Sequence, residues 1–360
     1  MTTPRDPSSA LAELRAALDA ATAGFLAERR GAMEQMAPGS TPLLDLVEGA
    51  GAAGGKRLRP VLCWCAYRAC GGRGAESAIL RAAGSLELLH TFAILHDDVM
   101  DQATLRRGHP ALHRRLASER RAAGHERDAD AYGVSIAVLA GDLALVLSDA
   151  MLARSGFSPE ALARASGPLA LMRLQAVTGQ YLDLAQSSGR PVPASDAVRI
   201  ERLKTAGYSV AGPVAFGAAL AGGDPSIPAA LDRWAVAVGE AFFLADELIG
   251  LYGDPAATGK DVESDLRRGK PTVLVARALE TASAADREAI AGRWGNPHAS
   301  AADLAAVRAA VSASGAEAAV RAEISRLLDG AWDVLVEAEL LDPTAWDILR
   351  QLAESLRPGA

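Results

Sequence analysis

Apolar residues recur every three or four positions along most of the chain, which is the spacing of amphipathic helices. Leu11, Leu14 and Leu18 mark an opening helix in this way. The alternating apolar and polar pattern of a strand does not recur. The other helices that the spacing predicts are 78–101, 134–155, 159–183, 195–221, 228–252, 272–294, 301–330 and 343–356.

Polar segments and segments rich in Gly and Pro separate these helices, and none looks like a domain linker. The segment 253–271 is longer than an ordinary helix–helix connection, so we interpret it as a functional loop. The sequence therefore predicts a single all-α domain over 1–360, a bundle of long helices around a central cavity. We expect flexible ends at 1–10 and 357–360.

Composition agrees with a helical, globular protein, because 50% of the residues are apolar and only 4% are aromatic. The net charge of −7 argues against a general nucleic-acid binder, which would carry a basic face. A few clustered Arg and Lys residues can still hold a diphosphate on an acidic protein. An anionic small molecule therefore remains a possible ligand, whereas nucleic acid does not.

The three cysteines, Cys63, Cys65 and Cys70, fall on one predicted helix, and we interpret them as packing residues rather than zinc ligands. Their odd number suits a reducing compartment. Residues 1–20 mix Arg, Asp and Glu, unlike a signal peptide. The longest apolar stretch, 134–147, contains an Asp and is too short to span a bilayer. We expect a cytoplasmic protein without stable membrane insertion.

Three aspartates at the end of the helix predicted over 78–101 are the sharpest chemical feature. Asp97 and Asp101 are four residues apart, so their carboxylates lie on one helical face and repel each other. A solvated acidic helix end is the plain alternative, but acids at a helix C-terminus oppose the macrodipole. A bound divalent cation would turn the repulsion into attraction, and Mg²⁺ prefers carboxylate oxygens. A second acidic pair, Asp246 and Glu247, follows another apolar run and could face the first across a cavity.

Cations cluster at several points of the chain. The segment GGKRLRP at 54–60 places three cations after paired glycines, where the backbone can approach an anion closely. Arg side chains bind phosphate oxygens in bidentate fashion. Each cation alone is more often a solvated surface charge, so the prediction rests on the set. The further members are Arg106, Arg107, Lys204, Thr205, Lys260 and Lys270.

In this order the motifs resemble those of the trans-isoprenyl diphosphate synthases, the polyprenyl synthetase family, from about Leu43 to Pro271. The segments that carry the resemblance are GGKRLRP at 54–60, LLHTFAILHDDVMD at 88–101, RRG at 106–108, GQYLD at 179–183, KT at 204–205 and GDPAATGKDVESDLRRGK at 253–270. Any one of these segments could arise by chance, whereas the ordered series is specific.

The resemblance implies a role for each matching residue. The diphosphate of isopentenyl diphosphate would be held without metal by Lys56, Arg59, His90 and Arg107. Mg²⁺ on the allylic diphosphate would be bound by Asp97, Asp101 and Asp246, with Asp98 in support. The allylic diphosphate would contact Arg106, Lys204 with its neighbour Thr205, and Lys270, while Gln180 lines the site and Lys260 belongs to a closing loop.

The family's chemistry explains these residue types. The allylic diphosphate ionises to a carbocation and pyrophosphate, and cations stabilise the negative charge that develops on the leaving group. The alkene of isopentenyl diphosphate attacks the carbocation, and the pyrophosphate takes up the released proton. Water has to be excluded, so the 253–271 loop is a candidate lid. The resemblance also implies a homodimer packed through helices.

The second acidic motif departs from the family pattern of Gln, two apolar residues and Asp-Asp-x-x-Asp. Phe243 replaces the polar residue, Glu247 the second acid, and Gly250 the third, while Asp246 remains. With these changes, the alternative that the chain is a non-catalytic or regulatory subunit of a heteromeric synthase stays open. Because Asp246 and the whole first motif remain, the sequence favours an active enzyme.

Product length would be limited by bulk four and five residues before Asp97, at Ala93 and Phe92. In the family two aromatic residues there suit a farnesyl product, and one aromatic beside a small residue suits geranylgeranyl diphosphate. We therefore expect geranylgeranyl diphosphate, although Phe92 could instead pack in the helix core. A class I terpene cyclase is a further alternative, but the chain lacks its Asn-Asp-x-x-Ser-x-x-x-Glu motif.

Overall fold

The structure is a computed structural model that describes residues 7–52, 54–187, 192–222, 226–253, 266–337 and 342–358. In the first half these form α1 (Pro7–Met36), α2 (Thr41–Ala52), α3 (Leu58–Ala69), α4 (Glu76–Met100), β1 (Leu105–Arg106), β2 (His109–Pro110), α5 (Leu112–Ala122), α6 (Ala129–Ala153) and α7 (Pro159–Gln186). In the second half they form α8 (Ala194–Glu201), η1 (Arg202–Ala211), α9 (Gly212–Ala221), α10 (Ser226–Tyr252), α13 (Val273–Thr281), α14 (Ala284–Ala291), α15 (Ala301–Ala313), α16 (Ala316–Glu337) and α17 (Pro343–Glu354). The predicted all-α class is confirmed.

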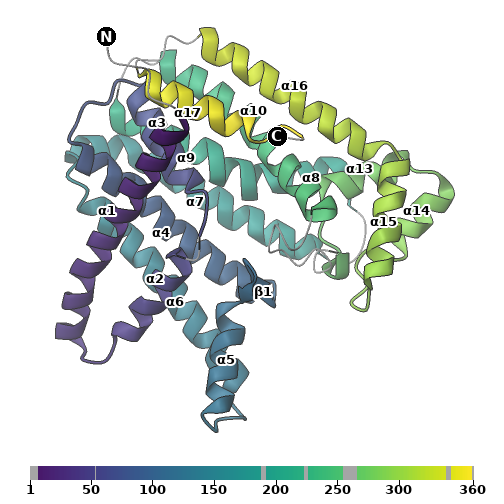
Figure 1. Ribbon diagram of the computed structural model, residues 1–360, viewed down its shortest axis with the longest axis horizontal. Helices are drawn as coiled ribbons and strands as arrows, with labels where there is room; N and C mark the ends of the chain where they lie inside the picture. The colour runs from purple at the N-terminus through teal and green to yellow at the C-terminus, as the bar shows by residue number, and fades with distance from the viewer. Residues whose placement is uncertain are drawn as a thin grey trace.

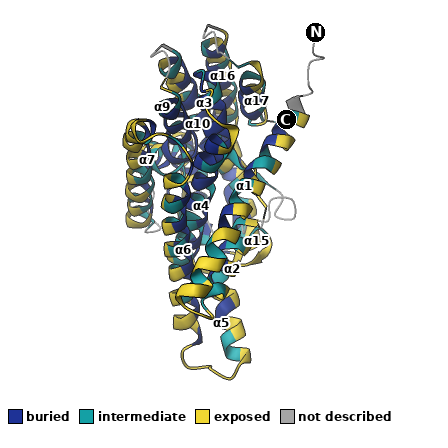
Figure 2. Cartoon of the chain, turned by 90° about the vertical axis from the view of Figure 1, so that its left-hand side faces the viewer, coloured by how far each residue is buried: buried dark blue, intermediate teal, exposed yellow. Residues whose placement is uncertain are grey.

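Long helices pack side by side around α3, α4, α9 and α10 (Figure 1). Helix α4 lies against α3 and α6, η1 lies between α7 and α10, and α16 covers α10. Figure 2 shows α3, α4 and α10 dark with buried residues, while α7 carries a line of exposed ones at the edge. Helix α5 projects at the lower end in Figure 1, and the short hairpin of β1 and β2 lies above it. Helix α4 is therefore largely buried, and its C-terminal end carries the acidic motif.

The sequence overestimated the length of two helices. The prediction of one helix over 272–294 is wrong, because α13 and α14 are separated at Ser283, whose hydroxyl accepts the Asp286 amide and starts a new helix. The prediction of one helix over 301–330 is also wrong. Gly315, with a φ of 80°, lies between α15 and α16. Helices α2 and α5 were not predicted.

The run predicted as one helix over 195–221 is continuous but changes its geometry. After α8, the backbone takes the wider π-helical form in η1 and returns to α-helical form in α9. π-Helical turns are rare and frequently occur at functional sites. The wide turn of η1 faces the central cavity, where Lys204, Thr205, Tyr208 and Ser209 all contribute side chains.

Three further observations bear on the sequence predictions. Helix α1 begins at Pro7, inside the stretch 1–10 that we expected to be a flexible end. The three cysteines are buried in the core cluster, and burial raises the pKa of each thiol. Among the described residues α4 and α6 are long and apolar enough to cross a membrane by length and composition, a test that the core helix of a soluble protein also passes.

Candidate active site

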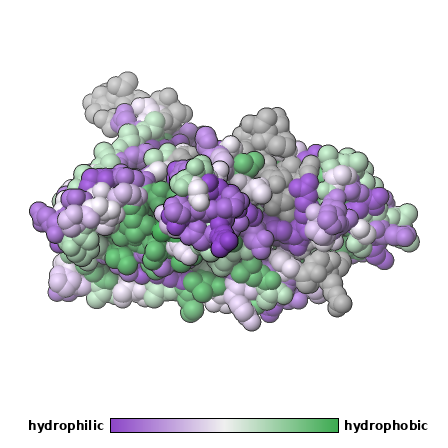
Figure 3. All heavy atoms as spheres, turned by 90° about the horizontal axis from the view of Figure 1, so that it is seen from below, coloured by the Kyte–Doolittle hydropathy of each residue, from purple (hydrophilic) through white to green (hydrophobic). Residues whose placement is uncertain are grey.

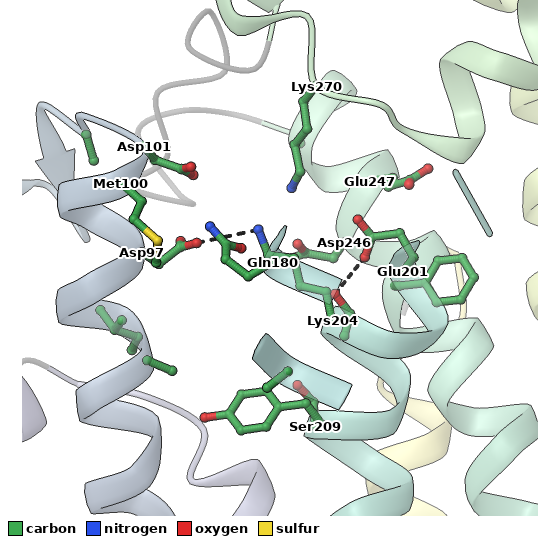
Figure 4. Close-up of a pocket in the computed structure, with 18 of the residues that line it drawn as sticks. Asp97, Met100, Asp101, Gln180, Glu201, Lys204, Ser209, Asp246, Glu247 and Lys270 are labelled. Carbon is green, nitrogen blue, oxygen red and sulfur yellow. Dashed lines mark hydrogen bonds and ion pairs between the residues drawn. The ribbon is translucent and has the colours of Figure 1, made fainter. Parts of the chain in front are cut away.

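A cavity of about 880 Å³ lies between the C-terminal end of α4, helix α7, η1, the end of α10 and the segment that leads into α13. Figure 4 shows acidic side chains of α4 on one side and those of α10 on the other, with Lys204 and Lys270 between them. Most of the predicted site residues meet here. Those that line the cavity are Arg59, His90, Phe92, Ala93, Asp97, Asp101, Arg106, Arg107, Gln180, Lys204, Thr205, Asp246 and Lys270.

Among the described residues, two of the predicted site residues, Asp98 and Lys56, do not line the cavity. Asp98 is turned into the protein and is 3% exposed. Lys56 is exposed, and its carbonyl oxygen accepts a hydrogen bond of 3.0 Å from Arg15 Nε. Lys260 lies outside the described residues.

The three carboxylates of the first acidic motif take two different positions: two line the cavity and one pairs with Arg106. Asp97 and Asp101, one helical turn apart, both line the cavity. Asp98 instead accepts hydrogen bonds from Arg106, at 2.8 Å from its Nε and also from its Nη2. Arg106 Nη2 also lies 3.5 Å from Asp97 Oδ2. Asp98 therefore fixes the guanidinium of Arg106 beside the acidic face of α4, as a supporting rather than a cavity-lining residue.

Lys204 reaches across from η1 to two carboxylates. Its Nζ lies 2.5 Å from Asp183 Oδ2 and 3.4 Å from Asp97 Oδ1. Asp183 is 3% exposed, so this ion pair is largely shielded from water. Asp183 belongs to the GQYLD segment, but no role was predicted for it from the sequence. Its spacing of three residues from Gln180, almost one helical turn, was the available signal.

Burial and the charges around the cavity shift the pKa values of the three aspartates in different directions. Burial alone would raise the pKa of Asp97, but the charges of Lys204 and Arg106 outweigh it and lower that pKa. Burial raises the pKa of Asp101, and the neighbouring charge of Asp97 adds to this effect. Burial also raises the pKa of Asp98, against the opposing Arg106 hydrogen bond. The lysine therefore stabilises Asp97 as an anion, which is the form that binds a cation.

The donor set fits a metal that takes part of its coordination shell from substrate. Among the described residues no three His, Cys, Asp or Glu side chains come together as a complete metal site. Mg²⁺ is usually bound by one or two carboxylates, with waters and substrate phosphates completing the shell. Asp97 and Asp101 on α4 and Asp246 on α10 offer such partial sets from two sides of the cavity.

A second group of polar residues lies deeper along α4. Arg59 Nη2 donates a 2.6 Å hydrogen bond to the Ser209 hydroxyl, and its guanidinium stacks on the ring of Tyr208 at 4.3 Å. The hydroxyl of Tyr208 lies 3.5 Å from His90 Nδ1. Arg107 donates to the Gly54 carbonyl, which joins the glycine-rich turn to this group. Tyr208 and Ser209 were not predicted as site residues, although both follow Lys204 within the same helical run.

The altered second motif has a clear local structure. Asp246 lines the cavity and is exposed. Glu247 also lines the cavity, and its carboxylate accepts hydrogen bonds from the Val273 and Leu274 amides at the start of α13. Burial raises the pKa of Glu247 to about 8, and the nearby charge of Glu201 contributes. Phe243 is 2% exposed, so the residue that replaces the family's polar side chain packs in the core.

Below the acidic end the cavity wall becomes apolar. Phe92 packs edge-on against the ring of His96, with centroids 4.7 Å apart, while the small Ala93 beside it leaves space. Helices α7 and α10 contribute further apolar residues to the wall, among them Ala176, Val177, Leu184 and Phe242. This combination of a charged end and an apolar wall suits a diphosphate attached to a hydrocarbon chain.

Comparison with known proteins agrees with this geometry. The profile of the polyprenyl synthetase family matches residues 41–311, and the chain belongs to that family. Geranylfarnesyl diphosphate synthase of Aeropyrum pernix is 32% identical over 84% of this chain and 89% of its own. Geranylgeranyl diphosphate synthase of Mycobacterium tuberculosis is 35% identical over 66% of this chain and 63% of its own.

A solved structure extends the likeness over nearly the whole chain. Geranylgeranyl pyrophosphate synthase from Corynebacterium glutamicum, complexed with isoprenyl diphosphate and magnesium, superimposes with a TM-score of 0.90 at 34% identity. The match covers 96% of this chain and 98% of that one. The predicted family and the predicted trans-prenyl diphosphate synthase activity are therefore confirmed.

Proposed function

We propose that this chain elongates an allylic diphosphate with isopentenyl diphosphate to geranylgeranyl diphosphate, with Mg²⁺ as its metal. One observation supports this most strongly. Carboxylates of α4 and α10 face Lys204 and Lys270 across a cavity whose wall then becomes apolar. Two relatives with similar sequences are named for different products. Product length is therefore inferred from the residues that form the cavity wall of this chain.

The allylic diphosphate lies at the acidic end. Asp97, Asp101 and Asp246 would hold Mg²⁺, and the bound metal would neutralise negative charge on the leaving pyrophosphate. Arg106, fixed by Asp98, and Lys204, fixed by Asp183, direct their positive charges at the diphosphate oxygens. Lys270 approaches from the segment before α13, with Thr205 and Gln180 beside the substrate.

Isopentenyl diphosphate lies next to the glycine-rich turn. Arg59, His90 and Arg107 line this part of the cavity, and Lys56 extends from the same turn. Tyr208 supports the Arg59 guanidinium by stacking. Burial and the charge of Arg59 lower the pKa of His90, so its neutral imidazole meets the substrate.

The reaction balances without a protein base. The bond between the allylic carbon and the diphosphate oxygen breaks, and both electrons leave with the pyrophosphate. The alkene of isopentenyl diphosphate forms the new carbon–carbon bond to the allylic carbon. A proton is then lost to an oxygen of the departing pyrophosphate, which gives the elongated diphosphate. The apolar wall keeps water from the carbocation.

Product length is set by Phe92 below the acidic end. Its ring is held against His96, so it is a fixed floor, whereas Ala93 leaves room beside it. One bulky and one small residue admit a longer tail than two bulky ones.

The test is elongation by the purified chain from dimethylallyl, geranyl and farnesyl diphosphates, with Mg²⁺ and with chelator. Geranylgeraniol after dephosphorylation, formed only with metal, is the expected product. A shorter or longer alcohol would refute the floor at Phe92 while leaving the chemistry intact. No elongation from any primer would favour the alternative of a subunit that needs a partner.

The chain acts as a homodimer in this proposal. Helix α7 exposes an apolar stripe with a spacing of three to four residues, consisting of Leu171, Leu174, Val177, Tyr181 and Leu184. Leu174 is 62% and Tyr181 68% exposed. Figure 3 shows apolar side chains at the surface on both sides of a polar projection. Because Val177, Tyr181 and Leu184 also line the cavity, a second copy on this stripe would cover part of its wall.

Light scattering after gel filtration tests the dimer with a matched pair of variants. Leu174→Glu should yield a monomer, because it places a charge in the stripe. Val336→Glu, on α16 and 60% exposed, should remain a dimer. A monomeric wild-type chain, or equal behaviour of both variants, would refute the interface.

A further inference from the structure

Glu247, where the second acidic motif departs from the family pattern, is already engaged by the backbone. Its Oε1 accepts a 2.9 Å hydrogen bond from the Val273 amide, and its Oε2 a 2.8 Å bond from the Leu274 amide. Figure 4 shows its carboxylate on the side of the cavity away from Asp97 and Asp101. Glu247 would have to release both amides to bind a metal there with both oxygens.

These bonds complete the N-terminus of α13. The first amides of a helix have no partner within the helix, so a side-chain oxygen that accepts from them is favourable there. The Thr272 hydroxyl accepts the Val275 amide at 3.3 Å, while Glu247 accepts those of Val273 and Leu274. The first three amides of α13 are therefore satisfied, two of them by a side chain from another helix.

The segment that Glu247 holds in place carries Lys270. The Lys270 carbonyl accepts a 3.0 Å hydrogen bond from Trp294 Nε1 and a 2.9 Å bond from the Thr272 amide. The segment is thus fastened at Lys270 by Trp294 and at the start of α13 by Glu247. Figure 4 shows the Lys270 side chain directed from this segment into the cavity, between Asp97 and Asp246.

We propose that Glu247 is a positioning residue, which fastens α13 and thereby directs Lys270 at the allylic diphosphate, while Asp246 alone of the pair serves the metal. This inference rests on the proposed function of the site. The longer side chain of Glu, compared with the Asp of the family pattern, provides the reach to α13. The departure at this position thus has a structural task.

Glu247→Gln tests the proposal because it keeps the side-chain length but leaves one acceptor oxygen for two amides. We expect faster hydrogen exchange at the Val273 and Leu274 amides. The KM for the allylic diphosphate should rise about tenfold through misplacement of Lys270. The KM for isopentenyl diphosphate, and Mg²⁺ affinity measured by calorimetry with inorganic pyrophosphate, should stay within about twofold of wild type.

Glu240→Gln is the matched control on the same helix. Glu240 pairs with Arg202 at 2.7 Å, away from α13, so its loss should leave amide exchange in α13 and both KM values unchanged. Asp246→Asn is the positive control for loss of metal affinity, because it should weaken Mg²⁺ binding.

A double variant decides whether the effect passes through Lys270. In a Lys270→Ala background Glu247→Gln should raise the KM for the allylic diphosphate by less than about twofold, because the group that it positions is already gone. A full tenfold effect in that background would refute the proposal. So would a loss of Mg²⁺ affinity equal to that of Asp246→Asn with the α13 amides still protected.

If the wild-type chain shows no elongation, the proposed function fails, but the positioning role is still decided. Amide exchange in Glu247→Gln and calorimetric binding of pyrophosphate to Glu247→Gln, Lys270→Ala and the double variant need no turnover. Unchanged exchange and binding in Glu247→Gln would then overturn the role. Faster exchange, with weaker binding that Lys270→Ala reproduces, would support it.

Discussion

Gly179 of α7 packs directly against the Lys204 backbone of η1, so Gly179→Ala should affect both stability and catalysis. A methyl group there would lie 2.7 Å from the Lys204 Cα and 2.8 Å from its Cβ, and closer still to its backbone nitrogen. Ordinary van der Waals contact begins near 3.4 Å. The backbone at Lys204 therefore has to move by about 0.7 Å or more, since the contact is with main chain that cannot rotate away.

Two consequences follow from that movement. Overpacking of this kind costs about 1–3 kcal/mol of unfolding free energy. The displacement also disturbs the bond between Lys204 and Asp183, which fixes the lysine. Because misplacing a binding group by 1 Å can cost about 10²-fold in rate, we expect kcat/KM for the allylic diphosphate to fall by between about 10-fold and 10²-fold.

Urea unfolding and steady-state kinetics measure the two effects, with Gly330→Ala as the control. Gly330 lies in α16 with nothing within 4 Å of the added methyl, so that variant should gain about 0.5–1 kcal/mol. Its kinetics should equal those of wild type. If Gly179→Ala also gains stability and keeps its kcat/KM within twofold, the tight packing of α7 on η1 is not what positions Lys204.

Three other predictions concern α4. Asp97→Asn should lower Mg²⁺-dependent turnover by about 10²-fold and raise the metal concentration needed for half activity, as a metal titration would reveal. Phe92→Ala should shift products beyond geranylgeraniol; an unchanged alcohol on chromatography would place the floor elsewhere. Because the pKa of His90 is lowered in the folded chain, its contribution to stability is complete above about pH 6.5 and is lost as pH falls below that value. Urea unfolding should therefore show a lower free energy of unfolding at pH 5.5 than at pH 7.5, and His90→Asn should reduce this difference. An equal difference in wild type and variant would contradict the prediction.

The sequence determined those features that depend on near neighbours. The helical class follows from the spacing of apolar residues, which reflects contacts one turn apart. The shared face of Asp97 and Asp101 follows from the same geometry, because four residues make about one turn. For this reason the acidic end of α4 could be read before the fold was known. Sequence reasoning failed where a break depended on a single cap, as at Ser283 and Gly315.

Only the tertiary structure decided which distant groups meet. The bond between Glu247 and the Val273 amide joins residues 26 apart, and that between Lys204 and Asp183 joins residues 21 apart. Nor does the spacing of η1 reveal Tyr208 as the support of Arg59, since the two are brought together by packing of α3 on η1. Helical periodicity fixes which face a side chain occupies, but the partner opposite that face depends on how whole helices pack, which no local pattern encodes.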